Sequence, residues 1–276
     1  MMISSGFILF AIFCLGLIIG SFLNCLIYRM QIGRDLGGRS FCPECKHPLA
    51  AADLVPVISF IELKGRCRYC GKRISIQYPL VELVVGSLFA AVAVLIVPSF
   101  VFGFDLSFSA VFSLFYHWFL ISALTVIFVY DLKWYLIPDG AVISCAVAAV
   151  LFHGFEIYEQ AGAGNSDLNI LADPILSAFF AGSFFLAIYL VSRGKWMGFG
   201  DVKFAFMMGF VLGFPEILIA LFLAFSLGAI IGSGLILLKK RRISSEIPFG
   251  PFLVAGTVIA LFFGSAIADW YMAAIF

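Results

Sequence analysis

The sequence predicts an all-α polytopic membrane protein with about eight transmembrane helices and a small zinc-stapled cytosolic loop domain. Of its 276 residues, 63% are apolar and 12% are charged, whereas soluble domains are roughly 45–50% apolar and about 25% charged. A soluble fold of this size could not cover so much apolar surface, because about a quarter of the surface of the unfolded chain stays exposed to solvent after folding. The same composition excludes intrinsic disorder and a coiled coil.

The apolar residues fall into runs near the ~20 residues that a helix needs to cross a bilayer. We expect eight spans, of which the fourth and the sixth are short. They lie at residues 6–28, 79–98, 109–130, 140–155, 174–192, 202–214, 216–238 and 251–272. This divides the chain into a first transmembrane helix (1–28), a cytosolic loop domain (29–78) and a set of membrane-embedded helices (79–276).

The distribution of charge orients these spans. Nine of the 17 Lys and Arg residues lie between Arg29 and Arg73. The others are Lys133, Arg193, Lys195, Lys203, Lys239, Lys240, Arg241 and Arg242. With eight spans, all of these fall on one side, in the loops or the adjoining helix ends, whereas the opposite loops (99–108 and 156–173) contain acidic residues and no basic residue. The positive-inside rule therefore predicts a cytosolic 29–78 loop and two periplasmic termini. The net charge of +1 gives no reason to expect a nucleic-acid partner.

Four cysteines in the 29–78 loop have the spacing of a zinc site. Cys42 and Cys45 form CPEC, Cys67 and Cys70 form CRYC, and 21 residues separate the pairs. Two such turns can surround Zn²⁺ with four thiolates, which leaves no open position and indicates a structural metal. The alternatives are two disulfides, which a reducing cytosol disfavours, or a redox-active pair.

Two carboxylates are expected at the cytosolic edge of the membrane. Asp131 ends the third span, in VYDLKWYLIPD, and Asp201 opens the sixth, in MGFGDVKF. Carboxylates at such a depth are costly and are functional candidates. If the two acids meet, they tend to share a proton, as in aspartic proteolysis. Gly198 and Gly200 would allow a sharp turn and close approach of a substrate strand. The structural alternatives are that Asp201 caps a helix and that Asp131 is an interfacial charge near Lys133.

Motifs along almost the whole chain resemble those of the type IV prepilin peptidase family, which are GxGD-type membrane aspartyl proteases. Besides the two CxxC pairs, they are GSFLNCLIYR (20–29), GRCRYCGKRIS (65–75), YPLVEL (78–83), DLKWYLIPD (131–139), GFGDVKF (198–204) and PFGPFL (248–253). GxGD alone also occurs in presenilin-like proteases. Its combination with the tetracysteine loop and the first-helix motif is much more specific.

The resemblance implies an enzyme of the bacterial inner membrane that has two activities. It would cleave the basic leader of type IV prepilins or type II secretion pseudopilins at the cytosolic face. It would then N-methylate the new N-terminus with S-adenosylmethionine. Asp131 and Asp201 match the catalytic aspartates, Asp139 matches a supporting acid, and Cys42, Cys45, Cys67 and Cys70 match the zinc ligands.

The binding site for the methyl donor is not identified by sequence. No GxGxxG motif follows a predicted strand, so S-adenosylmethionine would have to use the cytosolic loop and nearby helix ends. The polar residues to test there are Arg29, Asp53, Glu62 and Glu82. Each also has a structural interpretation, as a helix anchor or an ion-pair partner.

Two other functions remain open from sequence. One is an intramembrane aspartyl protease with a different substrate. The other is a cation-coupled transporter in which Asp131 and Asp201 carry the ion. A transporter would be expected to have polar residues near mid-membrane in several helices, and the second, fifth, seventh and eighth predicted spans have almost none.

Overall fold

The computed structural model describes residues 2–162, 169–238 and 247–275, and within these ranges the regular structure is helical. Seven of the described helices are long and apolar enough to cross a membrane, which confirms the predicted all-α polytopic class. The chain divides into two compact units, Met1–Thr125 and Val126–Phe276. The boundary between them falls inside one long helix, α5 (Phe108–Trp134).

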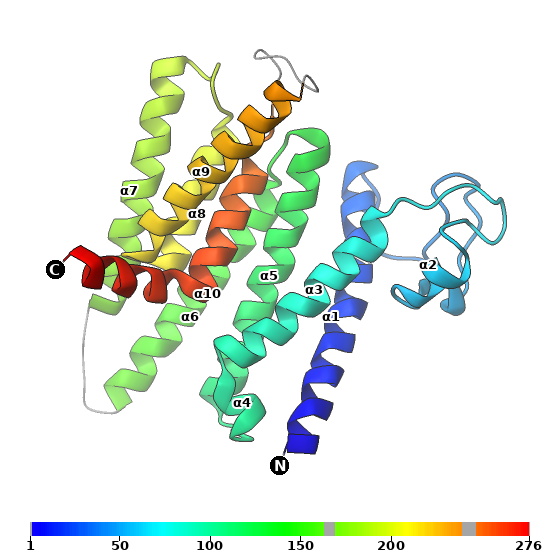
Figure 1. Cartoon of the computed structure of the whole chain (residues 1–276), viewed down its shortest axis with the longest axis horizontal. Helices are drawn as coiled ribbons and strands as arrows, with labels where there is room; N and C mark the ends of the chain where they lie inside the picture. The colour runs from blue at the N-terminus through cyan, green and yellow to red at the C-terminus, as the bar shows by residue number, and fades with distance from the viewer. Residues whose placement is uncertain (1, 163–168, 239–246, 276) are drawn as a thin grey trace. The chain divides into compact units, whose positions relative to one another are not determined.

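The first unit is built on two long helices, α1 (Met2–Gln31) and α3 (Gln77–Leu95), which pack along each other. Glycines allow this close approach, because a Cβ on Gly16 would lie 2.6 Å from the Cα of Gly86 and one on Gly20 would lie 2.7 Å from the Cα of Glu82. The short helices η1 (Ala51–Leu54) and α2 (Ile58–Glu62) lie in the loop that joins α1 to α3 (Figure 1). A further short helix, α4 (Pro98–Phe102), follows α3.

The second unit contains α6 (Asp139–Gly162), α7 (Asn169–Ser192), α8 (Phe199–Leu212), α9 (Glu216–Leu237) and α10 (Gly250–Ile275). The closest pairs are α7 with α8 and α9 with α10. Both pairs meet at a glycine. A Cβ on Gly209 would lie 2.4 Å from the Ser177 carbonyl oxygen, and one on Gly256 would lie 2.3 Å from that of Ala220. The small residue in each case brings two backbones together.

The fourth predicted span differs most from its observed helix, and the sixth is as short as predicted. The fourth, predicted at 140–155, continues to Gly162 because its polar end stays helical, with His153 Nδ1 3.0 Å from Glu156 Oε2 one turn later. The sixth, predicted at 202–214, corresponds to α8, which has only 14 residues. At ~1.5 Å per residue it covers about 21 Å, less than the ~30 Å hydrocarbon core. The basic cluster at residues 239–242, which was used to predict the orientation of the spans, lies outside the described residues.

Candidate functional site

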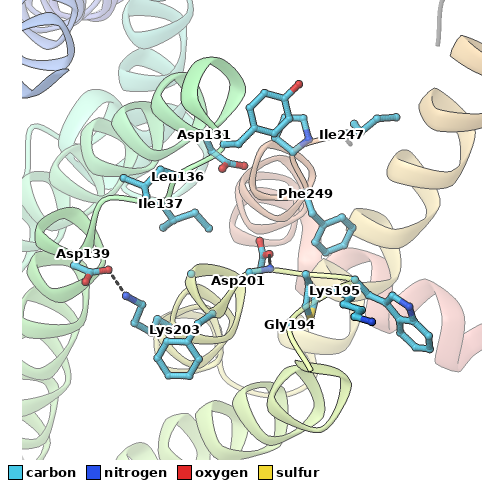
Figure 2. A pocket seen from close by; sticks show the side chains of 17 residues that line it. Asp131, Leu136, Ile137, Asp139, Gly194, Lys195, Asp201, Lys203, Ile247 and Phe249 are labelled. Atoms are coloured by element: carbon cyan, nitrogen blue, oxygen red, sulfur yellow. Dashed lines mark hydrogen bonds and ion pairs between the residues drawn. The ribbon is translucent and has the colours of Figure 1, made fainter. Parts of the chain in front are cut away.

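The second unit contains a pocket of about 690 Å³ that is formed where several helices begin or end. Helix α5 ends at Trp134, and the chain then runs without helical structure to α6. This segment, the chain before and at the start of α8, and the residues before α10 line the pocket (Figure 2). Its wall mixes apolar side chains such as Ile137, Ile247 and Phe249 with three carboxylates and two lysines. The pocket therefore offers both apolar and charged contacts to a ligand.

Asp131 and Asp201 both line this pocket, although they are 70 positions apart in the sequence. Their side chains point toward the same space, Asp131 from the end of α5 and Asp201 from the first turn of α8 (Figure 2). Both residues are buried, with exposed fractions of 5% and 9%. Two buried carboxylates in one pocket do not ionise together readily, so one is expected to hold a proton when the other is charged.

The hydrogen bonds of the two acids differ. Asp201 Oδ2 accepts a hydrogen bond of 3.2 Å from the backbone N–H of Gly198, the residue at the N-cap of α8. Asp131 Oδ2 is buried and has no hydrogen-bond partner among the described residues. A buried carboxylate oxygen without a partner is costly, which is consistent with a group that engages a water molecule or a substrate.

The two glycines of GxGD have different local roles. Gly200 is packed closely, since a Cβ there would lie 3.2 Å from the Cβ of Ile137 across the pocket. Gly198 has extended backbone angles (φ −77°, ψ 157°) that other residues also adopt, and its nearest neighbour would be 3.8 Å from a Cβ. Gly200 thus brings the start of α8 close to the segment that follows α5, whereas the open space beside Gly198 leaves the backbone accessible from the pocket.

Asp139 lies in the lining of the same pocket but has a partner of its own. It is the first residue of α6, and its carboxylate pairs with Nζ of Lys203 on α8 (Figure 2). Its side chain is 63% exposed. The structure therefore separates it from the two buried acids, and the pair links the elements that follow Asp131 and carry Asp201.

The four cysteines of the loop domain converge in the first unit. All four Sγ atoms lie within 4.8 Å of one another, and the cysteines are not joined as disulfides. Cys42 and Cys67 are buried. With Zn–S distances of ~2.3 Å, a tetrahedral zinc ion fits four thiolates gathered in this way. The cluster can hold a metal, as the spacing predicts.

The two CxxC turns have the same backbone design. In the first, Cys42 N–H donates to His47 O and Lys46 N–H donates to Cys42 O. In the second, Cys67 N–H donates to Lys72 O and Gly71 N–H donates to Cys67 O. The residue after each second cysteine has a positive φ, 60° at Lys46 and 70° at Gly71.

Side chains also join the two turns to each other. Lys72 Nζ lies 2.6 Å from Glu44 Oε2, and the rings of His47 and Tyr69 lie 3.8 Å apart. Although desolvation acts to raise the pKa of Cys67, hydrogen bonds from the backbone amides of Cys70 and Tyr69 and interactions with the other cysteines lower it to about 7. A thiolate is thus accessible at neutral pH for a metal.

Three of the four polar residues considered for a methyl donor are engaged by the protein itself. Asp53 receives hydrogen bonds from Arg68 Nε (2.7 Å), Tyr69 Oη (3.0 Å) and the Ala50 amide (3.0 Å). Burial acts to raise the pKa of Asp53, but these donors outweigh it and hold that pKa below its usual value. Glu82 is buried on α3 and accepts a 2.7 Å hydrogen bond from the Val57 amide.

Arg29 is also a structural residue. It is 4% exposed, and its guanidinium donates to a run of backbone carbonyls in the loop after α1. The acceptors are the carbonyl oxygens of Asp35, Leu36, Gly37, Gly38 and Arg39. Glu62 is exposed at the end of α2. These four residues therefore do not form a cofactor site together.

Three features of the site were not found from sequence. The partner of Asp139, Lys203, lies two residues after Asp201, and Gly250 packs against Asp131. The motif PFGPFL contains Gly250 but carries no chemical group that marks it as part of the site. The backbone carbonyl groups that accept hydrogen bonds from Arg29 are brought together by the path of the 35–39 loop. Apart from its two glycines, nothing in the sequence of this loop predicts that path.

Comparison with known proteins identifies relatives over nearly the whole chain. Residues 14–96 match the bacterial peptidase A24 N-terminal domain, and residues 118–233 match the type IV leader peptidase family. A prepilin leader peptidase/N-methyltransferase of Aeromonas salmonicida (strain A449) is 33% identical, over 96% of this chain and 94% of the relative. Proteins of the same name are 33% identical in Aeromonas hydrophila (95% and 92% covered) and 32% identical in Bacillus subtilis strain 168 (95% and 96% covered). No solved structure matches the chain significantly.

Proposed function

The chain belongs to the type IV leader peptidase family, and from this premise we propose that it is a membrane aspartyl peptidase that removes the basic leader of prepilins or pseudopilins. The observation that carries the proposal is the presence of two buried carboxylates, Asp131 and Asp201, in one pocket. The names of the relatives support the substrate, since they are prepilin leader peptidases.

The proposed chemistry needs one ionised and one protonated aspartate. The ionised carboxylate removes a proton from a water molecule, whose oxygen attacks the carbonyl carbon of the scissile peptide bond. The protonated carboxylic acid donates a hydrogen bond to the carbonyl oxygen, where negative charge develops. The carboxyl group that took the proton from water then passes it to the leaving nitrogen as the C–N bond breaks, which completes the cleavage. The unpartnered Asp131 Oδ2 supports a role for this oxygen in contact with water or substrate.

The location of the pocket supports a substrate that enters from the membrane surface. The acids lie at helix ends, beside a segment with Lys195 and the exposed Trp196, residue types that commonly lie at membrane interfaces. The charge distribution supports a cytosolic pocket and periplasmic termini in a bacterial inner membrane. A prepilin would place its basic leader in the cytosol and its apolar helix in the bilayer, so that the junction lies at this depth.

We also propose that the tetracysteine cluster binds zinc and stabilises the loop domain. Four thiolates would complete the coordination of the ion, so its contribution is to folding. For the second activity, N-methylation of the new N-terminus with S-adenosylmethionine, the support is that the relatives are named N-methyltransferases. Three of the four polar residues considered for that cofactor are engaged by contacts within the protein itself.

The proposal is tested by co-expression of the chain with a prepilin and measurement of leader removal by mass spectrometry. Asp131→Asn and Asp201→Asn are each expected to lower cleavage by about 100-fold or more, because each removes a group needed for proton transfer. Asp105→Asn, which changes an acid remote in sequence from the pocket motifs, is the matched control and should cleave normally. Full cleavage by either pocket variant at equal expression would exclude that residue from the mechanism. A gain of one CH₂ on the mature N-terminus would report methylation separately.

A further inference from the structure

The start of α10 packs directly against one of the two pocket acids. Gly250, the first residue of that helix, is buried and has no Cβ. A Cβ at this position would lie 2.5 Å from Oδ2 of Asp131, 3.0 Å from its Cγ and 3.3 Å from its Cβ. Real Cβ atoms essentially never approach another heavy atom at 2.5 Å, so any other residue at 250 must displace the Asp131 carboxyl group.

Gly250 also presents its backbone to the same acid. Its N–H approaches the Asp131 carboxyl group, although Oδ2 has no hydrogen-bond partner among the described residues. At the beginning of a helix the first amides have no partner within the helix. An ionised carboxylate beside them is stabilised by their dipoles. The glycine thus allows the amide end of α10 to come as close to Asp131 as backbone atoms permit.

Aromatic packing holds this helix start in place. The ring of Phe249, the preceding residue, lies 5.1 Å from that of Phe225 on α9 and 6.2 Å from that of Phe185 on α7. It also lies 6.2 Å from the ring of Phe252 in the first turn of α10. The backbone at 250 is therefore fixed by contacts with two other helices, and a clash there cannot be relieved by a simple shift of the chain.

We propose that Gly250 is a positioning residue for the peptidase reaction, which sets the location of the Asp131 carboxyl group through backbone contact at the start of α10. It does not line the pocket itself, so it acts through Asp131 and not on the substrate. The inference rests on the proposed function of Asp131, but its structural part, the contact of residue 250 with that side chain, can be tested without catalysis.

The kinetic test compares Gly250→Ala with the wild-type protein in detergent micelles, with the prepilin substrate in both cases. We expect kcat to fall by about 100-fold, because a misplacement near 1 Å has an effect of this size, while KM stays unchanged. Gly228→Ala is the matched control. Its Cβ would meet the same aromatic rings at ordinary distances, 3.4 Å from Phe252 and 3.5 Å from Phe249, and it should keep normal kcat. Normal kcat in Gly250→Ala would overturn the proposal.

A stability test separates the contact from the chemistry. Gly250→Ala should lower the midpoint of thermal unfolding by about 5 °C in the wild-type background. In an Asp131→Ala background, which removes the carboxyl group that it would strike, the same change should have almost no effect. Equal destabilisation in the two backgrounds, or failure of both Gly250→Ala proteins to fold, would overturn the proposal. If Asp131→Asn cleaves normally but the two changes are coupled in stability, the proposed function fails while the packing contact stands.

Discussion

Asp139 and Lys203 form an ion pair between the first residue of α6 and the second turn of α8, across 64 positions of sequence. The pair ties the helix that follows Asp131 in the chain to the helix that carries Asp201. Because Asp139 is 63% exposed and Lys203 is 35% exposed at the side chain, the pair is expected to contribute less than about 1 kcal/mol.

This small contribution predicts a mild effect on cleavage. Asp139→Asn should lower the initial rate of leader removal by less than about tenfold, since 1 kcal/mol corresponds to less than a factor of ten. Lys203→Met should have a similar effect, and the double variant should lose no more than either single one. Rates under identical conditions for the four proteins measure this coupling. Additive losses, or a loss as deep as that of Asp131→Asn, would assign Asp139 a separate role.

Loss of two thiolates should remove the metal from the loop domain. Cys42→Ser with Cys45→Ser is expected to abolish bound zinc and to lower the midpoint of thermal unfolding, because the remaining pair cannot complete a tetrahedral site. Zinc per protein can be measured by atomic emission. Cys14→Ser, which changes a cysteine within α1 outside the cluster, should retain a full complement of zinc. An unchanged zinc content in the double variant would rule out this site.

Replacement of Arg29 by lysine should loosen the loop after α1. The guanidinium donates to the backbone carbonyl groups of five consecutive residues, 35–39. The ammonium group of lysine has fewer N–H donors, and they are not arranged in a plane. We expect Arg29→Lys to cost about 1–3 kcal/mol, as for unsatisfied buried polar groups. Limited proteolysis should then cut the protein faster within residues 33–39. The exposed Arg73→Lys serves as control, and equal cleavage rates for the two variants would contradict the structural role of Arg29.

The contact between α7 and α8 should not tolerate a larger residue at its centre. A methyl group at Gly209 would lie 2.4 Å from the Ser177 carbonyl oxygen, so Gly209→Ala is expected to destabilise the second unit by about 1–3 kcal/mol. Gly154→Ala on α6, where a Cβ would meet nothing within 4 Å, should be neutral or slightly stabilising. The midpoint of thermal unfolding is measured for both variants. An unchanged midpoint in Gly209→Ala would show that α7 and α8 can move apart with little loss of stability.

The membrane helices and the cysteine cluster were predictable because their signals are local. Long apolar runs identify spans, and CxxC spacing identifies a metal site whichever way the rest of the chain folds. The short length of α8 was predicted, but its ends were not, because the apolar residues near its end continue past Leu212 through Gly213 and Phe214 although the helix stops. Pairings such as Gly250 with Asp131 come from the packing of distant helices. Neither a glycine nor an aspartate indicates in the sequence that such a contact will form.

The shortness of α8 has a consequence for how water reaches a substrate whose apolar helix lies in the bilayer. Four neighbours, α6, α7, α9 and α10, surround this helix, and its 14 residues reach only about two thirds of the way through a hydrocarbon layer ~30 Å thick. Asp201 stands in its first turn and lines the pocket. Under the proposed function, a short helix that begins at one membrane surface leaves space for water beside Asp201, at the depth where the leader of a substrate joins its apolar helix.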